Sequence, residues 1–468
     1  MISRIGEKFT DLFQKYMPDS FVFALLLTLI VGICALIFMG SSPIDILIGW
    51  YDGFWELLEF GMQLSLIIVT GFSIALSPII RKGIDNLTKF INTPRQVYFF
   101  VCLIALLLSV ISWGWIVVAA VLARELALRV KGVNYPYLIA CVYISNISWV
   151  TGLASTIPLL LNTENNYLIE GGILENTIPT ALTLGSTLNI SMMILLVVLI
   201  PILMTLFVPK TNIREIGDML INKTKGSNKE ETIEEEADSL KLPFKAVSDT
   251  LNNTSLIQWT VSILGLIYVV YYFATKGLDL NLNIMIFIFI MLGLLLHKTP
   301  VRYGIAMRKA SSNVSGILFQ FPFYAGIMGI MTFTGLGEEF AKALASVATI
   351  DTYPFFSYLI GGVVNFAIPS GGGEFAVIGP SVIEAVNNIG TSAGLAGAEL
   401  TQMTARASLS IAYGECLTNL LQPFFLLLVI PVMGAGIKIQ ARDVMGYLVL
   451  PFLIFFIAQT LMVTFIPL

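Results

Sequence analysis

Residues 353–385 read YPFFSYLIGGVVNFAIPSGGGEFAVIGPSVIEA, an apolar stretch interrupted at residues 369–373 (PSGGG). Proline removes a backbone donor and glycine admits unusual backbone angles, so a helix is expected to unwind there. Unwound backbone inside a membrane is tolerated only where it lines a cavity or is buried in protein. The N–H groups of the half-helix that follows can bind a carboxylate. The alternative is a tight helix crossing that needs small residues. The residues predicted here to contact a substrate or an ion are Asn365, Ser370, Gly371, Gly372, Gly373 and Glu374.

The whole chain is strongly apolar. Of its 468 residues, 56% are hydrophobic and 12% are charged, against about 25% charged in a soluble domain. A helix needs about 20 apolar residues to cross a bilayer. Continuous runs without period-2 alternation favour helices over a β-barrel. The apolar runs are Phe21–Met39, Leu64–Ile80, Thr187–Val208, Leu256–Phe273, Leu282–Leu296 and Tyr447–Ile466.

These runs predict an all-α polytopic protein of a bacterial cytoplasmic (inner) membrane, with the lipid bilayer as its partner. Residues 1–19 predict an amphipathic helix on the membrane surface. Residues 209–255 are polar and predict a cytoplasmic linker. Residues 20–208 and 256–468 are then two transmembrane repeats of similar length. No basic stripe indicates a nucleic-acid partner.

The two halves repeat landmark residues at a nearly constant offset, and their loops carry opposite charge. Residues 40–60 contain four acids and no Lys or Arg, whereas residues 298–309 contain four basic residues and no acid. Since cytoplasmic loops collect Lys and Arg, the halves are predicted to be inverted relative to each other, with the N-terminus cytoplasmic and the C-terminus outside. The pairs 257–259 residues apart are Pro43 and Pro300, Gln63 and Gln320, Thr93 and Thr352, Ser112 and Ser370, and Glu125 and Glu384.

Basic clusters on both sides of residues 96–122 predict that this segment enters the membrane and returns on the same side. Its midpoint carries Ser112, Trp113 and Gly114, which are therefore predicted site residues. The same reasoning predicts a second re-entrant hairpin at residues 353–385. The alternative is that each segment is a full crossing that breaks at its midpoint.

A carboxylate inside an apolar run is costly, which makes Glu415 a candidate functional group. It can bind Na⁺, carry a coupling proton, or form an ion pair with Arg406. Tyr413 lies beside it, and Asn419 and Gln422 follow four and seven residues on, at the spacing of one helical face. All three are predicted to line the same site.

The corresponding part of the first half carries Asn146 and Thr151. Uncharged amides and hydroxyls suit a ligand or Na⁺ site, and they equally suit hydrogen bonds between helices. With one histidine and no Ser/His/Asp arrangement, the chain is not expected to be an enzyme. No cofactor is expected beyond a coupling Na⁺ or H⁺, and the one metal considered is a possible Na⁺ near Glu415.

Several motifs together resemble the short-chain fatty acid transporter family along nearly the whole chain. The resemblance implies transport of small monocarboxylates, an ion-transporter-superfamily fold of the elevator type, and a homo-oligomer, with a dimer favoured. It also implies that the glycine run and residues 413–415 contact substrate or ion. Glu374 and Phe375 depart from the family pattern, which has a histidine and a tryptophan after the three glycines. The motifs are DGFW (52–55), GMQ (61–63), WG (113–114), ARE (123–125), YP (135–136), AC (140–141), LLHKTP (295–300), QFPFYAG (320–326), PSGGG (369–373), IAYGE (411–415) and QPF (422–424).

The predicted function is secondary active transport of short-chain fatty acids or similar small monocarboxylates, coupled to H⁺ or Na⁺. The alternatives are a channel, a carrier for another small organic anion such as a dicarboxylate, and a membrane-embedded enzyme. A dicarboxylate would need fixed positive charge, and neither predicted hairpin tip contains Lys or Arg.

Overall fold

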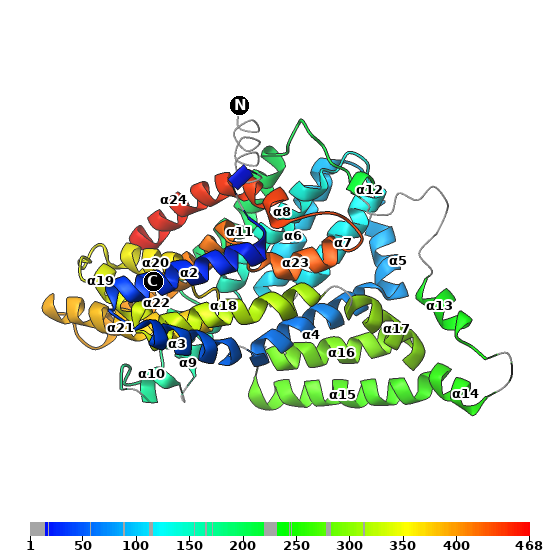
Figure 1. The fold of residues 1–468 in the computed structure, drawn as a ribbon, viewed down its shortest axis with the longest axis horizontal. Coiled ribbons are helices and arrows are strands. Elements are labelled where there is room, and N and C mark those ends of the chain that lie inside the picture. The colour runs from blue at the N-terminus through cyan, green and yellow to red at the C-terminus, as the bar shows by residue number, and fades with distance from the viewer. Residues whose placement is uncertain are drawn as a thin grey trace.

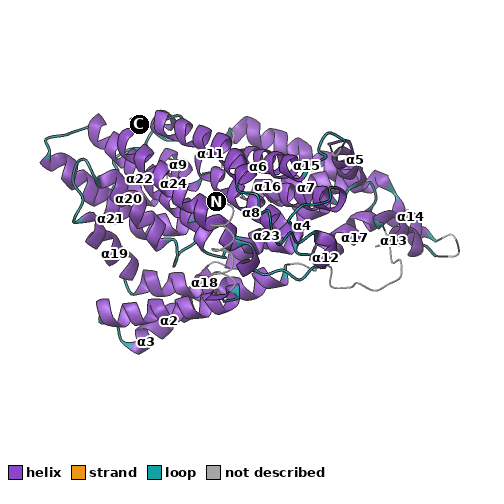
Figure 2. Cartoon of the chain, turned by 90° about the horizontal axis from the view of Figure 1, so that it is seen from above, coloured by secondary structure: helices purple, strands orange, loops and turns teal. Residues whose placement is uncertain are grey.

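The computed structural model of the chain is an elongated bundle of helices (Figure 1). Every regular element that it describes is a helix, which confirms the predicted all-α class (Figure 2). The predicted amphipathic helix at residues 1–19 lies mostly outside the described residues, as do residues 112–115. The described residues are 15–16, 18–56, 58–87, 89–111, 116–153, 155–163, 166–170, 172–219, 232–242, 244, 246–277, 282–311 and 314–468.

The first half begins where Asp19 caps a helix by accepting a hydrogen bond from the N–H of Phe21, over 3.0 Å. Its last long helix starts at a second cap, where Ser186 accepts from the N–H of Asn189. The elements of this half are α2 (Ser20–Phe38), α3 (Pro43–Glu56), α4 (Leu58–Ala75), α5 (Pro78–Leu87), α6 (Pro94–Ile111), α7 (Ile116–Arg129), α8 (Tyr135–Ser145), η2 (Asn146–Thr151), α9 (Thr156–Asn162), α10 (Tyr167–Glu170), η3 (Thr180–Leu182) and α11 (Thr187–Leu206).

The described elements of the linker and of the second half are also helices. The linker helices are α12 (Ile216–Met219), α13 (Ile233–Ser239) and α14 (Val247–Asn253). The second half contains α15 (Ser255–Lys276), α16 (Leu282–His297), α17 (Pro300–Ser311), α18 (Ser315–Phe333), α19 (Leu336–Ala345), α20 (Tyr353–Val364), α21 (Gly371–Ser392), α22 (Ala398–Thr418), η4 (Asn419–Leu421), α23 (Leu426–Met433), η5 (Ala441–Asp443), η6 (Met445–Leu448) and α24 (Val449–Phe465).

Helices of the two halves exchange packing partners. α3 packs along α18, and α17 packs along α4. Likewise α2 packs on α18 and α16 packs on α4, as Figure 1 shows near the middle of the molecule. α3 and α17 start 257 residues apart, and so do α4 and α18. This order is the one that a duplicated unit would give, although the relative orientation of the halves in a membrane stays a prediction.

Within the described residues, six helices are long and apolar enough to cross a membrane, or up to seven if one bent pair counts as a span. Four of the predicted apolar runs fall in these helices, at α2, α11, α15 and α24. The run Leu64–Ile80 is not one helix: α4 ends at Ala75, and α5 starts at Pro78 after Ser77, whose hydroxyl accepts from the N–H of Ile80. The run Leu282–Leu296 lies in α16, which has 16 residues. Two candidate spans lie outside the predicted apolar runs, at residues 94–111 and at residues 135–162.

Part of the linker docks on the second half. α13 packs on α17, with Ile233 and Ala237 against Ile305 and Ala306. Charge reinforces the contact. The ion pairs are Arg302 with Glu234 at 3.9 Å, Arg308 with Glu236 at 3.5 Å, and Lys309 with Glu236 at 2.9 Å. This acidic linker helix therefore lies on the basic helix of the loop that was predicted to be cytoplasmic.

The crossing of α20 and α22 depends on glycine. An ideal Cβ on Gly414 would overlap the carbonyl oxygen of Tyr358, and one on Gly361 would overlap the carbonyl oxygen of Ile411. The two backbones therefore approach more closely than any larger residue allows, which is the small-residue packing of membrane helices. Gly414 immediately precedes Glu415, so this crossing also fixes the position of that carboxyl group.

We expect Gly414→Ala to destabilise the protein by about 1–3 kcal/mol, because a buried methyl group must displace backbone of the neighbouring helix. The thermal unfolding midpoint of the purified protein measures the effect. Gly83→Ala is the control, since Gly83 lies in α5 with nothing within 4 Å of the added Cβ. Equal midpoints for Gly414→Ala and wild type would contradict the close crossing.

Candidate functional site

The predicted helix break at the glycine run is present. α20 ends at Val364, α21 begins at Gly371, and Ser370 between them has extended backbone with φ −144° and ψ 107°. The first regular helical bond runs from the N–H of Glu374 to the carbonyl oxygen of Ser370, over 2.6 Å. The first N–H groups of a helix have no partner within it. The glycine run therefore presents the positive end of a 22-residue helix.

The carboxyl group of Glu415 lies against this helix start. An ideal Cβ on Gly371 would lie 2.8 Å from Oε1 of Glu415, 3.2 Å from its Oε2 and 3.0 Å from Oγ1 of Thr156. Glu415 is 0% exposed, and neither of its carboxyl oxygens has a hydrogen-bond partner among the described residues. Glycine at position 371 thus leaves room for a buried carboxyl group beside the first turn of α21.

Glu374 is a second buried carboxyl group in the same place. It is 0% exposed, and within the described part of the chain both of its oxygens lack a hydrogen-bond partner. Its position is three residues after Gly371, a spacing that shares a helix face. Glu374 therefore belongs to the same first turn that the carboxyl group of Glu415 borders.

An ion pair between Glu415 and Arg406 was one alternative that the sequence left open, and it is wrong. Arg406 donates from Nε to the carbonyl oxygen of Val463 at 2.9 Å. Its Nη2 donates to the carbonyl oxygens of Thr464 at 3.0 Å and Ile466 at 2.6 Å. The guanidinium therefore satisfies the C-terminal carbonyl groups of α24, where a cation is favourable.

Amide side chains at the ends of α20 and α22 form hydrogen bonds with one another. Nδ2 of Asn365 donates to Oγ1 of Thr418 at 2.9 Å and to Oδ1 of Asn419 at 2.8 Å. Nε2 of Gln422 donates to the Asn365 carbonyl oxygen at 3.1 Å and to Oδ1 of Asn419 at 3.0 Å. The hydroxyl of Tyr143 in α8 donates to the carbonyl oxygens of Asn419 and Gln422, at 2.7 and 3.0 Å. This amide cluster joins the two breaks and connects them to the first half.

Asn419 and Gln422 lie close together, but not for the reason that the sequence indicated. Asn419 and Gln422 were predicted to share a face of one continuous helix, but α22 ends at Thr418 and Gln422 is extended, with φ −124° and ψ 149°. The chain bends by 45° between the α22–η4 segment and α23, at a break that contains Pro423. Oδ1 of Asn365 and Oε1 of Gln422 have no hydrogen-bond partner among the described residues.

Asn189 in α11 is a functional candidate that sequence reasoning missed. Its Oδ1 accepts a hydrogen bond from the hydroxyl of Tyr413 at 2.9 Å, and its Nδ2 donates to the Thr151 carbonyl oxygen at 3.0 Å. The hydroxyl of Thr151 donates a hydrogen bond to the carbonyl oxygen of Ser148. Asn189 thus links Tyr413 and Thr151, which were both predicted site residues. No local pattern in the sequence indicates Asn189, because it lies near a helix start among apolar residues.

Asn146 faces the second half across a small pocket. Its Oδ1 accepts from the Ser109 hydroxyl at 3.4 Å, and the thiol of Cys416 donates to the nearby carbonyl oxygen of Ile147 at 3.2 Å. The predicted residues Asn146 and Asn419 therefore line one pocket from opposite halves. Its lining residues are Tyr143, Asn146, Ile147, Trp149, Cys416, Asn419, Leu420 and Phe425.

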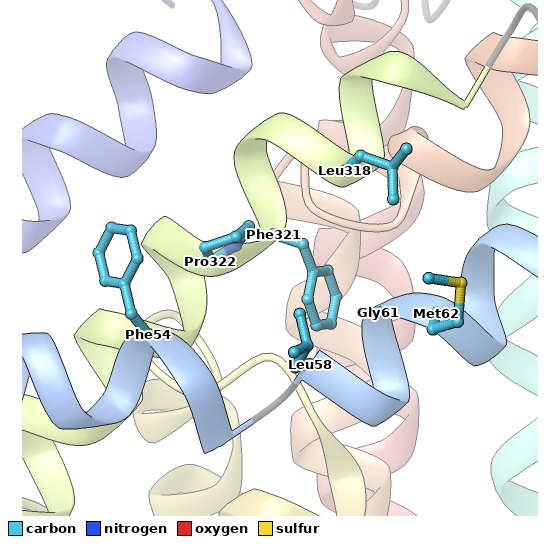
Figure 3. Close-up of a pocket in the computed structure, with 7 residues that line it drawn as sticks. All are labelled: Phe54, Leu58, Gly61, Met62, Leu318, Phe321 and Pro322. Carbon is cyan, nitrogen blue, oxygen red and sulfur yellow. The ribbon is translucent and has the colours of Figure 1, made fainter.

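A separate apolar depression lies between the α3–α4 region and α18 (Figure 3). Figure 3 shows its side chains facing one another from these helices, and none of them is polar. A carboxylate would therefore find no side-chain donor among these residues. The lining residues are Phe54, Leu58, Gly61, Met62, Leu318, Phe321 and Pro322.

The predicted residues Ser112, Trp113 and Gly114 lie outside the described residues. In the part of the chain that is described, no group of three or more His, Cys, Asp or Glu side chains gathers as metal ligands. A Na⁺ ion near Glu415 stays a prediction.

The start of α21 sets an electrostatic condition on any ligand. Helix N-termini attract anions, whereas two ionised carboxyl groups beside the same turn would repel one. Buried charges are also costly unless they are paired or neutralised. Neutral carboxyl groups at this turn would therefore favour an anion there, and ionised ones would oppose it.

Comparison with known proteins assigns the chain. Residues 1–466 match the family described as short chain fatty acid transporter. The chain belongs to this family. Two relatives, both provisionally named short-chain fatty acid transporter, come from Escherichia coli (strain K12) and Haemophilus influenzae (strain ATCC 51907 / DSM 11121 / KW20 / Rd). They are 36% identical over 451 residues and 34% identical over 453 residues, with 96% of the chain and 96% of each relative covered.

Membership of the short chain fatty acid transporter family confirms the resemblance seen in the sequence, and it confirms the prediction of a transporter rather than an enzyme. Two solved structures are weakly similar. MtrF of Neisseria gonorrhoeae, described within a class of antimetabolite efflux pumps, is 15% identical, with 97% of this chain and 96% of that chain covered and a TM-score of 0.41. The YdaH transporter of Alcanivorax borkumensis is 14% identical, with 97% of each chain covered and a TM-score of 0.41.

Proposed function

We propose that this member of the short chain fatty acid transporter family is a secondary active carrier of short-chain fatty acids or similar small monocarboxylates, coupled to H⁺ or Na⁺. The observation that carries the proposal is the carboxyl group of Glu415, buried without a partner among the described residues, against the start of α21. An ionisable residue inside a membrane protein marks a transport pathway by default. The family and its relatives supply the substrate class.

Coupling follows from the charges at the site. A monocarboxylate placed at the N-terminus of α21 would bring a third acidic group to a turn that Glu374 and Glu415 already border. The binding of the anion and of a cation must then favour each other, because each lowers the electrostatic cost of the other. A carrier with that property moves its substrate with the cation.

The groups around the break suit a monocarboxylate better than a dicarboxylate. No Lys or Arg lies in residues 365–375, and Arg406 is held by the end of α24. Phe375 is buried and Phe366 is partly buried on the two sides of the break. One carboxylate next to helix N–H groups, with a short alkyl chain among apolar side chains, matches this set.

The proposed setting is the bacterial cytoplasmic membrane, with the N-terminus and the linker inside and the C-terminus outside. Two predictions about sidedness, made from separate segments, support each other. The linker and the loop with Arg302, Arg308 and Lys309 were each predicted to be cytoplasmic, and α13 of the linker is bound to that loop's helix by ion pairs. The exchanged packing of α3 with α18 and α17 with α4 supports the inverted repeat.

We expect purified wild-type protein in liposomes to take up labelled butyrate saturably when an inward H⁺ or Na⁺ gradient is imposed. Glu415→Gln should lower gradient-driven uptake about tenfold or more, because an amide can neither carry the coupling proton nor supply a charge for Na⁺. The matched control is Glu399→Gln, because Glu399 lies in the same helix and is exposed. Unlabelled butyrate inside the liposomes should accelerate uptake, which separates a carrier from a channel.

Two results would count against this proposal. Absence of saturable uptake of butyrate, acetate or acetoacetate under every gradient would exclude the short-chain fatty acid assignment. If gradient-driven uptake persists in Glu415→Gln, Glu415 is not the coupling residue.

Orientation can be tested with fusions of alkaline phosphatase, which is active only outside the cytoplasm. A fusion after Leu468 should be active, and a fusion after Asp218 in the linker should be inactive. Activities in the reverse order would invert the proposed topology, and equal activities would place both ends on one side of the membrane.

A further inference from the structure

The described residues contain two fully buried acidic side chains, and both belong to the region around the first turn of α21. Glu374 in α21 and Glu415 in α22 are the Asp or Glu residues in that part of the chain whose side chains are buried. All four carboxyl oxygens lack a hydrogen-bond partner there. α21 packs on α22. Glu374 belongs to the first turn of α21, and the carboxyl group of Glu415 lies against Gly371 in the same turn.

The other titratable groups on these helices and their neighbours are engaged elsewhere. Tyr413 donates to Asn189, and Tyr358 of α20 donates to Oε1 of Gln459 at 3.1 Å. The thiol of Cys416 donates to a backbone carbonyl. Arg406 is bound to the end of α24, and Tyr353 at the start of α20 lies near Arg406.

The remaining charged groups are on the surface. On α19, Lys342 pairs with Glu338 at 3.5 Å with about half of each side chain exposed, and Glu339 is also on this helix. Glu384 of α21 and Glu399 of α22 are exposed. α9, η2, η3, η4 and α24, which also pack on α21 or α22, contain no titratable side chain. Among the described residues, no cation neutralises the pair.

Two adjacent carboxyl groups that are shielded from water cannot both ionise, because each charge raises the cost of the other. Keeping one proton removes the repulsion between the two groups. A proton on one carboxyl group needs no further ligands. Among the described residues, no third Asp, Glu, His or Cys side chain gathers with the two groups as a further metal ligand.

We propose that Glu374 and Glu415 form one carboxyl pair that holds a resident proton when the carrier is empty, and that a second proton joins the pair when the substrate anion binds. The second proton is the coupling ion. This inference rests on the proposed carrier function and deepens it, since it selects H⁺ over Na⁺ and assigns a role to Glu374.

The charges then balance between the two states of the site. The empty pair with one proton carries one negative charge. The loaded site has two protons on the pair and one substrate carboxylate, and it also carries one negative charge. Each cycle thus moves one carboxylate and one proton together. Transport should follow a pH gradient and should not respond to a membrane potential.

Infrared difference spectroscopy of the wild-type protein in liposomes tests the pair directly, because protonated and ionised carboxyl groups absorb separately. The exposed carboxyl groups give signals that all variants share. In addition to these, we expect a carboxylic acid signal at neutral pH and a second one on acidification, so that the buried pair titrates in two steps. Glu374→Gln and Glu415→Gln should each leave one of these steps at an intermediate pH, and the double variant should leave neither. Glu384→Gln is the control on the same helix and should keep both steps.

Adding butyrate at neutral pH should increase the acid signal of the wild type, as the second proton binds. Fully ionised carboxyl groups at neutral pH, or a titration that Glu374→Gln leaves unchanged, would overturn the pair. Loss of the acid signal on adding Na⁺ alone, or a butyrate response that is absent while both steps remain, would overturn the coupling role. Since the wild-type spectra need no transport, a pair that titrates as expected in a protein without butyrate uptake would refute the proposed function and not the pair.

Discussion

Glu415 places a carboxyl group, 0% exposed, against the first turn of α21, and an unpaired charge in such surroundings is costly. The neighbouring structure is arranged around that group. Gly371 leaves space for it, and Gly414 lets α22, which carries Glu415, pack closely against α20. Arg406 does not neutralise it, because the guanidinium group is bound to carbonyl groups at the end of α24. The group therefore depends on protons or on a ligand for its stability, which is the condition that a coupled carrier needs.

Irregular backbone in an apolar core must find partners within the protein, and this chain finds them across its two halves. The thiol of Cys416 donates to the carbonyl oxygen of Ile147 in η2, and the hydroxyl of Tyr143 donates to two carbonyl oxygens at η4. Each half thus contributes a broken helix to the same region, and a side chain of one half satisfies the backbone of the other. A movement of one half against the other would break and remake these bonds.

Local features were predictable from the sequence because their causes are local. The break at residues 369–373 follows from proline and glycine, and the burial of Glu415 follows from the apolar run around it. The partner of Tyr413 is 224 residues away and that of Tyr143 is 276 residues away, so neither could be found from spacing along a helix. Asn419 and Gln422 were identified correctly for the wrong reason, since the helix that was meant to align them ends at Thr418. The role left open for Arg406 failed because the acceptors it found, the carbonyl groups at the end of α24, are backbone atoms that any sequence supplies.

The central claim, that substrate binds at the exposed start of α21, is tested most directly by substrate protection of a cysteine at position 372. Gly372 has nothing within 4 Å of an added Cβ, and Cys34 is the native cysteine that is partly exposed. The measurement is the rate at which a polar thiol reagent labels Gly372→Cys in a Cys34→Ser background, with Thr391→Cys at the far end of the same helix for comparison. Binding at this turn predicts that butyrate slows labelling at position 372 and leaves position 391 unchanged. Labelling at position 372 that butyrate does not slow would contradict the claim.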